Sequence, residues 1–320
     1  MVKRLYEPKE KFVERIKLLL DDEEDVKKFF KMAKSEPRKS LRVNTLKISS
    51  DELMEGLRQK GWKVDQPFRD YPEIVKITSD LMPGEIGKAR EHLLGYYYVQ
   101  EVTSMMPIIA LDVKPGDIVL DLCAAPGSKT TQAAALMENS GSIIANDVSM
   151  GRISILSANL QRCGVTNTIV TRHNGIELIA KLRKLGFKFD KILVDAPCSG
   201  EGNLRCSPRT LLEWSEGLLK SMGRKQKRLL DGVVDLLKEG GELVYSTCTY
   251  APEENEMVVQ YLLDNYDMKI LDSKLPLKTR SGLTEWKGQN FDKSMKKAVR
   301  IYHHDNDLEG FFVCRLGKVE

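Results

Sequence analysis

The stretch IVLDLCAAPGSKT, residues 118–130, decides the fold class of this chain. It begins with an apolar run typical of a buried strand, and Pro126 and Gly127 then form a turn before a predicted helix over 128–137. Small residues in such a turn let the backbone approach a ligand closely, and the free N–H groups at the start of the helix attract an anionic group. The stretch therefore predicts a ligand-binding loop between a strand and a helix.

A regular alternation of strands and helices extends outward from this loop. Further strands, each short, largely apolar and bounded by turn residues, are predicted at 142–146, 168–171, 191–195 and 242–246. Helices are predicted between them at 152–163, 176–185 and 211–237. Strands joined by helices form a parallel sheet covered on both faces, so residues 111–320 are predicted to form a doubly wound, Rossmann-like α/β domain. Ligands bind such a domain beyond the carboxyl ends of its strands.

Residues 1–110 precede this alternation and are predicted to form a smaller α+β domain. Helical patterns cover 9–20, 21–33 and 52–60, and extended segments are expected at LRVNTLK (41–47) and at 62–64. Three consecutive tyrosines, Tyr96, Tyr97 and Tyr98, could stack on bases or pack between domains, and we favour packing.

An acidic residue follows the second predicted strand of the α/β domain. Asp147 lies twenty residues after Gly127, where a carboxylate can accept hydrogen bonds from both hydroxyls of a ribose. The stretch 118–130 matches neither GxxxxGK nor GxGxxG, which disfavours a pyrophosphate. A ribose without a pyrophosphate suggests S-adenosylmethionine as cofactor; the alternative is an ordinary turn and a helix-capping aspartate.

Two cysteines also follow predicted strands of the same sheet. Cys198 lies in DAPCSGEG (195–202) after the fourth strand, and Cys248 lies in STCTY (246–250) after the fifth. A cysteine that is neither bridged nor bound to metal is usually a small core residue, and chance burial would not place two of them at the ligand edge of one sheet. Gly200 and Gly202 keep the first of these loops slim beside a substrate.

Composition and charge exclude several classes of protein. The 320 residues are 42% hydrophobic and 30% charged, which indicates a folded globular chain. No apolar run reaches the roughly 18 residues of a membrane helix, and the charged start lacks the apolar core of a signal peptide, so we expect no membrane partner and a cytoplasmic location. Six cysteines without a CxxC pair, and four histidines, show no zinc spacing, so no structural metal is expected. Oligomeric state stays open.

Basic residues gather in two segments of a chain whose formal net charge is +4. Lys220–Arg228 holds five lysines and arginines without an acid, and Lys269–Arg300 holds nine against three acids. Each segment is either a phosphate-contacting patch for nucleic acid or an ordinary solvated face.

These motifs together resemble the Sun-domain (NOP/Sun) family of RNA cytosine-5 methyltransferases, the archaeal transfer RNA enzymes being most similar. The resemblance runs from about Ser40 to the C-terminus through LRVNTLK, YYVQE, DLCAAPGSKT, DAPCSGEG, STCTY followed by PEENE, and EGFFVCRL. It implies an S-adenosylmethionine-dependent methyltransferase domain over 111–320 and an RNA-recognition region over 1–110.

The resemblance also implies a set of cofactor-binding residues. They are Cys123, Ala124, Ala125, Pro126, Gly127, Ser128, Lys129, Asp147, Arg152, Asn174 and Asp195. This chain departs from the family at two of them: the family usually has glycine where Ser128 stands, and commonly aspartate where Asn174 stands.

Chemistry at cytosine C5 gives the two cysteines separate tasks. A thiolate adds to C6, the resulting enamine carbon C5 attacks the methyl group, and a base then removes the C5 proton. The resemblance implies that Cys248 attacks and Cys198 assists release, although DNA cytosine-5 methyltransferases attack with the cysteine of their PC motif, so residue logic alone leaves the order open. Asp195 is the natural acid for N3, and Lys129 could supply positive charge that favours a thiolate.

We therefore expect an RNA cytosine-5 methyltransferase that uses S-adenosylmethionine. The compact N-terminal region favours transfer RNA over ribosomal RNA as substrate. A catalytically idle RNA-binding assembly factor is an alternative, which the retained cysteines and aspartates argue against. A methyltransferase for proteins or small molecules is disfavoured by the basic segments and the paired cysteines.

Overall fold

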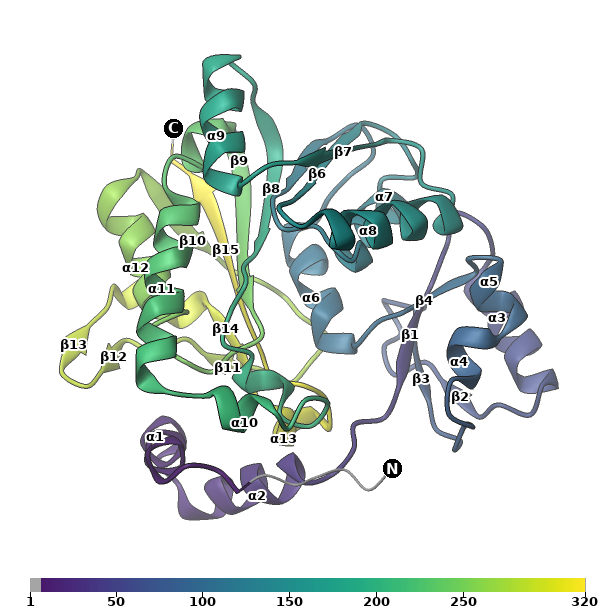
Figure 1. Cartoon of the computed structure of the whole chain (residues 1–320), viewed down its shortest axis with the longest axis horizontal. Coiled ribbons are helices and arrows are strands. Elements are labelled where there is room, and N and C mark those ends of the chain that lie inside the picture. The colour runs from purple at the N-terminus through teal and green to yellow at the C-terminus, as the bar shows by residue number, and fades with distance from the viewer. Residues whose placement is uncertain (1–6, 320) are drawn as a thin grey trace. The chain divides into compact units, whose positions relative to one another are not determined.

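A computed structural model of the chain describes residues 7–319 and divides into two compact units. The first unit is built from three separate stretches: the described part of Met1–Pro37, Ala196–Asp231 and Tyr245–Gly317. The second unit contains Arg38–Asp195, Gly232–Val244 and the residues from Lys318 onward. Figure 1 labels the helices and strands of both units.

The second unit begins with a small antiparallel sheet. Its strands are β1 (Ser40–Val43), β2 (Val64–Asp65), β3 (Ile74–Ile77) and β4 (Tyr97–Val99), in the order β2-β3-β1-β4. Helix α3 (Ser50–Gln59) begins with a capping box, because Ser49 and Glu52 bond each other's backbone N–H groups. Two short helices follow, α4 (Glu85–Lys88) and α5 (Arg90–Leu93). Leu41 of β1 and Leu57 of α3 form a shared apolar core with Trp62, which lies between α3 and β2.

A parallel sheet forms the larger part of the second unit. After α6 (Val102–Leu111) come β5 (Ile118–Asp121), α7 (Ser128–Leu136), β6 (Ser142–Asp147), α8 (Met150–Cys163), β7 (Thr168–Arg172), α9 (Gly175–Lys184) and β8 (Phe189–Asp195). β5 pairs in parallel with β6 and β8, and β6 pairs in parallel with β7. Parallel strands with helical crossovers confirm the predicted Rossmann-like α/β class. The carboxyl ends of these strands therefore meet at one edge.

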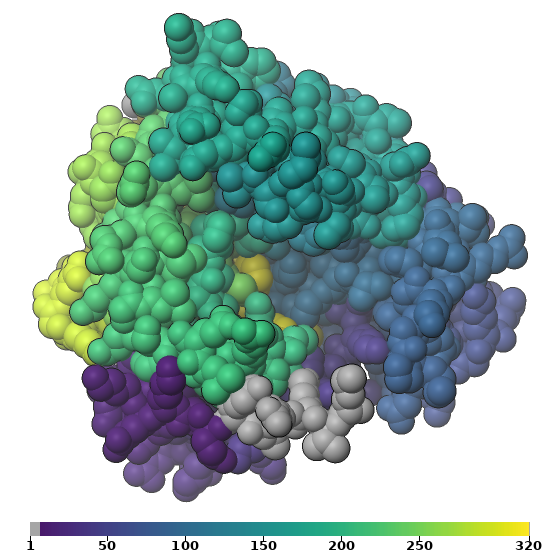
Figure 2. Space-filling model, in the orientation of Figure 1, coloured from purple at the N-terminus to yellow at the C-terminus, as the bar shows by residue number. Residues whose placement is uncertain are grey.

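The first unit packs helices from distant parts of the chain around one core. These are α1 (Glu10–Leu20), α2 (Glu23–Ala33), α10 (Thr210–Glu213), α11 (Glu216–Leu230), α12 (Glu256–Asn265) and α13 (His303–Asn306), with the 3-10 turns η1 (Glu201–Asn203) and η3 (Lys293–Lys297). Phe12 and Phe29 of the first two helices pack with Trp214, Tyr250 and Tyr302. Figure 1 labels α11, which is drawn in green, and Figure 2 shows the side chains of this green part of the chain as a space-filling surface.

Short strands complete the first unit. They are β10 (Met268–Leu271), β11 (Arg280–Ser281), β12 (Glu285–Trp286), β13 (Gln289–Asn290), β14 (Val299–Ile301) and β15 (Phe311–Lys318). β14 pairs antiparallel with β11 and β15, β10 pairs with β15, and β12 and β13 form a separate hairpin. The longer β9 (Leu237–Thr247) follows the 3-10 turn η2 (Val234–Leu236), starts in the second unit and ends in the first.

One predicted helix was wrong and several strands were not predicted. The segment 211–237 holds two helices, because Trp214 is extended and Ser215 caps α11 by accepting from the N–H of Leu218. The chain then turns at Gly232, whose φ is +75°, and β9 begins at Leu237. Helical spacing of apolar residues continues through Trp214 and conceals this break.

The tyrosine cluster packs as expected. Tyr97 and Tyr98 are 0% and 7% exposed, and the Tyr98 hydroxyl donates to the Pro126 carbonyl at 3.3 Å. Among residues 7–319, no helix combines the length and apolarity needed to cross a bilayer.

Candidate functional site

The loop after β5 is held close to its neighbours by backbone geometry. Gly127 caps α7 with a φ of +101°, and a Cβ there would lie 2.9 Å from a methyl carbon of Leu156, so only glycine fits. Arg42 is buried and donates to the Ser128 carbonyl at 2.7 Å, and Asn159 donates to the Pro126 carbonyl at 2.9 Å. These contacts hold the loop over residues 123–127 in place, and Ser128 and Lys129 form the first turn of α7.

A buried amide, which the sequence analysis did not identify, joins two of the strand ends. Asn146 donates to the carbonyls of Leu122 and His173 at 3.2 and 3.1 Å, and its Oδ1 accepts from the N–H of His173 at 3.0 Å. It thus connects the loop after β5 to the residue before Asn174. The sequence did contain a signal for this contact: Asn146 is a polar residue in the largely apolar predicted strand 142–146, and a buried polar side chain requires hydrogen-bond partners.

Asp147, Arg152 and Asn174 lie at the same edge of the parallel sheet or close to it. Asp147 is 3% exposed; one of its oxygens lies 3.2 Å from Arg152 Nη1, and the other accepts from the Ser149 N–H at 2.9 Å. Arg152 also donates to the carbonyl of Ala125. Asn174 is exposed and caps α9, where its side chain accepts from the N–H of Ile176 at 3.0 Å. A capping role alone accounts for Asn174 in this structure.

Lys129 and Asp195 form an ion pair. Lys129 Nζ lies 2.7 Å from Asp195 Oδ2 and 3.0 Å from the hydroxyl of Ser104, and Lys129 is 7% exposed. The structure thus brings together two residues that the sequence assigned to both catalysis and cofactor binding.

Carboxylates dominate the electrostatics of this edge. Burial raises the pKa of Asp121 to about 7, although Thr130 donates a hydrogen bond to it. Burial, together with the charges of Asp121, Asp195 and Asp147, raises the pKa of the Cys123 thiol. Cys123 therefore stays protonated at neutral pH. The buried carboxylate of Asp147 at the end of β6 suits the hydroxyls of a ribose, and the turn at Gly127 lets the backbone approach a ligand closely, so the residues present fit S-adenosylmethionine.

The two cysteines predicted to act in catalysis meet in the first unit. Cys198 Sγ and Cys248 Sγ lie 3.1 Å apart, and the side-chain amide of Asn203 donates to Cys248 Sγ at 3.3 Å. The hydrogen bond to Cys248, together with burial, raises the pKa of Cys198 well above its usual range. Cys198 therefore keeps its proton at neutral pH.

Two glycines let the cysteine loops approach each other. The N–H of Gly202 donates to the carbonyl of Cys248, and the N–H of Gly310 donates to the carbonyl of Gly202, both at 2.9 Å. A Cβ on Gly202 would lie 2.2 Å from the Gly310 oxygen, so no other residue fits. This is the slim loop that the sequence predicted.

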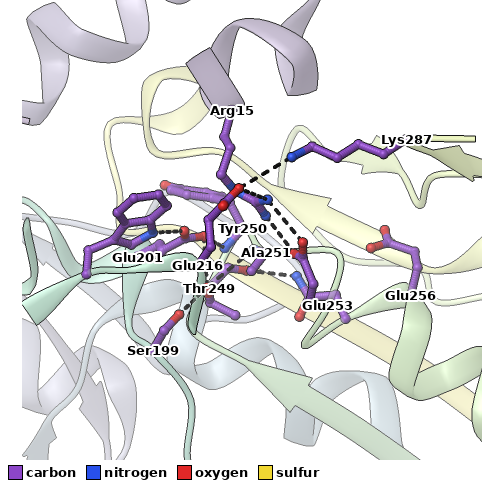
Figure 3. A network of polar contacts seen from close by, with 12 residues as sticks. Arg15, Ser199, Glu201, Glu216, Thr249, Tyr250, Ala251, Glu253, Glu256 and Lys287 are labelled. Carbon is purple, nitrogen blue, oxygen red and sulfur yellow. Dashed lines mark hydrogen bonds and ion pairs between the residues drawn. The ribbon is translucent and has the colours of Figure 1, made fainter. Parts of the chain in front are cut away.

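A buried glutamate, Glu201, joins the two cysteine loops (Figure 3). It accepts from the indole N–H of Trp214 at 2.6 Å, from the hydroxyl of Thr249 at 3.0 Å and from the N–H of Tyr250 at 3.2 Å. Burial raises the pKa of Glu201.

A second buried glutamate, Glu254, holds the peptide groups on either side of Cys198. Glu254 accepts from the Ser199 N–H at 3.0 Å and from Gln226 at 2.9 Å, and Gln226 donates to the Pro197 carbonyl at 2.9 Å. Burial raises the pKa of Glu254 to about 7. Glu201 lies in DAPCSGEG, Glu254 lies in PEENE and Asn203 directly follows DAPCSGEG, but no role was predicted for any of the three.

Two arginines of the basic segment 269–300 form ion pairs within the protein. Arg300 is buried and pairs with Glu256 at 2.6 Å, and Arg280 pairs with Asp25 at 2.5 Å and with Asp305 at 2.7 Å. For these two arginines the phosphate-contact interpretation was wrong. On α11 the exposed basic residues are Lys220, Arg224, Lys225 and Arg228.

One cluster within the described chain has the spacing of metal ligands, namely Asp25, His304 and Asp305. Arg280 already donates to both carboxylates, and His304 Nε2 lies 3.0 Å from Asp25. These contacts account for the cluster as an ion-pair network.

Comparison with known proteins identifies relatives for nearly the whole chain. Residues 108–317 match the family model "16S rRNA methyltransferase RsmB/F", and residues 9–102 match "N-terminal domain of 16S rRNA methyltransferase RsmF". The chain is 41% identical to a tRNA (cytosine(49)-C(5))-methyltransferase of Pyrococcus abyssi over 96% of both chains. It is 39% identical to ribosomal RNA small subunit methyltransferase F of Erwinia tasmaniensis over 96% of this chain, and spans 63% of that relative's length.

Solved structures extend this similarity to three dimensions. A methyltransferase homolog from Pyrococcus horikoshii superimposes with a TM-score of 0.81 at 34% identity, covering 97% of this chain and all of that one. NSun6 from the same organism, solved with SFG, gives 0.84 at 26% identity over 98% of both chains.

Proposed function

Since this chain belongs to the 16S rRNA methyltransferase RsmB/F family, we propose that it is an S-adenosylmethionine-dependent enzyme that methylates C5 of cytosine in RNA. The observation that carries the proposal is the pair of thiols at 3.1 Å, Cys198 and Cys248. C5 of cytosine is a poor nucleophile, and a thiolate that adds to C6 turns C5 into a reactive enamine carbon. A second thiol beside the first suits the later step, in which C5 loses its proton and the C6–S bond breaks.

Cys248 is the proposed nucleophile and Cys198 the group that assists release. This order is the one that the family resemblance implies, and the side-chain amide of Asn203, which donates to Cys248 Sγ at 3.3 Å, supports it, because such a donor favours a thiolate at Cys248. Asp195 is proposed to protonate N3 of cytosine, a step for which its carboxylate must first take up a proton, and Lys129, paired with it at 2.7 Å, to supply positive charge during the addition.

The cofactor, when bound, supplies a methyl group on a positively charged sulfur. The residues proposed to hold it are those of the loop after β5 and of the neighbouring strand ends: Cys123, Ala124, Ala125, Pro126, Gly127, Ser128, Lys129, Asp147, Arg152, Asn174 and Asp195. Asp147 has the buried carboxylate suited to ribose hydroxyls.

Transfer RNA is the proposed substrate. The Pyrococcus abyssi relative, named for a transfer RNA position, matches over 96% of its length, whereas the Erwinia ribosomal RNA enzyme has further sequence that this chain does not cover. Ribosomal RNA is the second candidate, supported by 39% identity to that enzyme. A cytoplasmic location suits either substrate.

Residues 1–110 are proposed to recognise the RNA and residues 111–320 to catalyse the reaction. The family models support this division. The N-terminal model ends at residue 102 and the methyltransferase model begins at residue 108, close to the proposed boundary. Exposed lysines and arginines of α11 are proposed as further phosphate contacts.

The decisive experiment transfers labelled methyl groups from S-adenosylmethionine to purified transfer RNA or ribosomal RNA, followed by bisulfite sequencing. We expect 5-methylcytosine at a defined transfer RNA position, and none with Cys248→Ala. Label in ribosomal RNA alone would select the second candidate. A wild-type protein that binds RNA but transfers no methyl group would instead support the idle assembly factor.

A further inference from the structure

The side-chain amide of Asn203 contacts the sulfur atom of Cys248. Asn203 Nδ2 lies 3.3 Å from Cys248 Sγ and donates a hydrogen bond to it. We propose that Asn203 is a catalytic residue that stabilises the thiolate of Cys248, an inference that rests on the proposed function for its role in methyl transfer. A hydrogen bond to a charged acceptor is stronger than one to a neutral acceptor, so this contact favours the ionised sulfur over the thiol.

The local backbone fixes the direction of this amide. Asn203 ends the 3-10 turn η1, where its N–H donates to the Gly200 carbonyl at 2.9 Å and its carbonyl accepts from the Ser207 N–H at 2.7 Å. Gly200 has a φ of +76°, which the turn requires. The bond between Gly202 N–H and the Cys248 carbonyl sets the distance between the two loops. The donor is thus in place before any substrate arrives, and no reorganisation is needed during the reaction.

The carboxylates around the thiol pair act in the opposite direction. Glu254 bonds the backbone beside Cys198, and Glu201 bonds the residues after Cys248. A carboxylate near a thiol disfavours its ionisation. Cys198, which keeps its proton at neutral pH, can donate its S–H to Cys248 Sγ at 3.1 Å and then acts in the same direction as Asn203. The amide of Asn203 offsets the effect of the carboxylates at Cys248. When Cys248 ionises, its proton leaves to solvent, and the electron pair on Sγ keeps the hydrogen bond from Asn203 until it forms the bond to C6.

Alkylation of Cys248 tests the inference without RNA or cofactor. The full-length protein with Cys206→Ser, which removes an exposed thiol, is treated with iodoacetamide from pH 5.5 to 10, and modification of Cys248 is followed by peptide mass spectrometry. In Asn203→Leu the pH of half-maximal reactivity should rise by about one unit, equivalent to about tenfold less thiolate at neutral pH. The maximal rate at high pH should match the parent. Asn203→Asp, which has nearly the same shape but presents a carboxylate, should raise the midpoint further.

Asn265→Leu is the matched control, because this exposed asparagine of the same unit donates to the Tyr261 carbonyl of its own helix and lies on α12, outside the two cysteine loops. Its midpoint should equal that of the parent. If Asn203→Leu fails to fold by circular dichroism, Asn203→Ala replaces it. An unchanged midpoint, or a rate lowered equally at every pH, would overturn the inference.

A second readout links Asn203 to methyl transfer. The pH profile of a single turnover on RNA should move upward by the same amount in Asn203→Leu, and the rate should recover at high pH. If Cys248→Ala still methylates RNA, Cys248 is not the nucleophile and that part of the proposed function is wrong. The inference about Asn203 is decided separately, by the pH of half-maximal alkylation of Cys248.

Discussion

The ammonium group of Lys129 lies 2.7 Å from the carboxylate of Asp195, and both residues come from the elements that hold the predicted cofactor loop. Lys129 is 7% exposed, so its charge has little access to water and depends on this partner and on the hydroxyl of Ser104. A buried ion pair of this kind contributes to the stability of the fold mainly because removing one partner leaves the other charge buried and unpaired.

Lys129→Met should therefore lower the free energy of unfolding by about 1–3 kcal/mol, because it leaves the Asp195 carboxylate without its cation. Urea denaturation measures the effect, and Lys129→Arg should retain most of the stability. Adding Asp195→Asn to Lys129→Met should recover part of the loss. Strictly additive effects of the two substitutions would contradict the coupling.

Asp147→Ala should weaken binding of S-adenosylmethionine by about 1–3 kcal/mol in calorimetry without RNA, because two ribose hydroxyls lose a charged acceptor. Asp112→Asn, at an exposed aspartate of the same unit, controls for the change in charge and should bind normally. Equal affinities for the two variants would remove Asp147 from the cofactor site.

Glu254→Gln should alter the pH dependence of stability. Burial raises the pKa of Glu254 to about 7, above that of the unfolded chain, so the folded protein binds more protons and loses stability as the pH rises from about 4 to 7. The glutamine can still accept from Ser199 and Gln226, but it does not ionise. Relative to wild type, the variant should therefore gain stability between pH 5 and pH 8, by roughly 3 kcal/mol at most. Urea denaturation at both pH values measures this, and a constant difference would contradict it.

The two cysteines should behave differently when each is replaced. Cys248→Ala should lose both turnover and any covalent complex with RNA, because no C6 adduct can form. Cys198→Ala should methylate once and then stall with RNA attached, giving a slower band in denaturing electrophoresis. RNA without cytosine is the control and should give no band. The reverse pattern would exchange the two roles, as in the DNA enzymes.

Replacing Lys220 and Lys225 of α11 by alanine should reduce the slope of log affinity for RNA against log salt by about one to two units. Both residues are exposed. The control replaces two exposed lysines of α2 in the same unit, Lys27 and Lys28. An identical slope in the Lys220 and Lys225 variant would return α11 to an ordinary solvated surface.

The strands of the parallel sheet could be predicted because each is an apolar run bounded by turn residues. β2, β11, β12 and β13 have two residues each, too few to show a period, and their pairing depends on partners elsewhere in the chain. The predicted helix over 211–237 failed for a related reason: Trp214 is held extended by contacts with Glu201 and the core, which local spacing does not reveal.

Candidate site residues could be predicted from the sequence where they lie at the end of a single predicted strand. Cys198, Cys248, Asp147 and Asp195 each follow or end a strand and were identified on that basis. Asn203, Glu201 and Glu254 were not, because their contacts join loops that are about fifty residues apart in sequence. Only the folded chain brings Glu254 beside Ser199.

The three-part construction of the first unit sets an order for folding during synthesis. The apolar faces of α1 and α2 are translated first, yet the aromatic residues that cover them, Trp214, Tyr250 and Tyr302, are translated late. At a synthesis rate of about 5–20 residues per second, Trp214 is added about 10–40 s after Phe12 and Phe29. The second unit, which is mostly one continuous stretch, can gain much of its structure in that interval. Until Trp214, Tyr250 and Tyr302 have been made, the apolar faces of α1 and α2 therefore lack the aromatic residues that cover them in the folded unit.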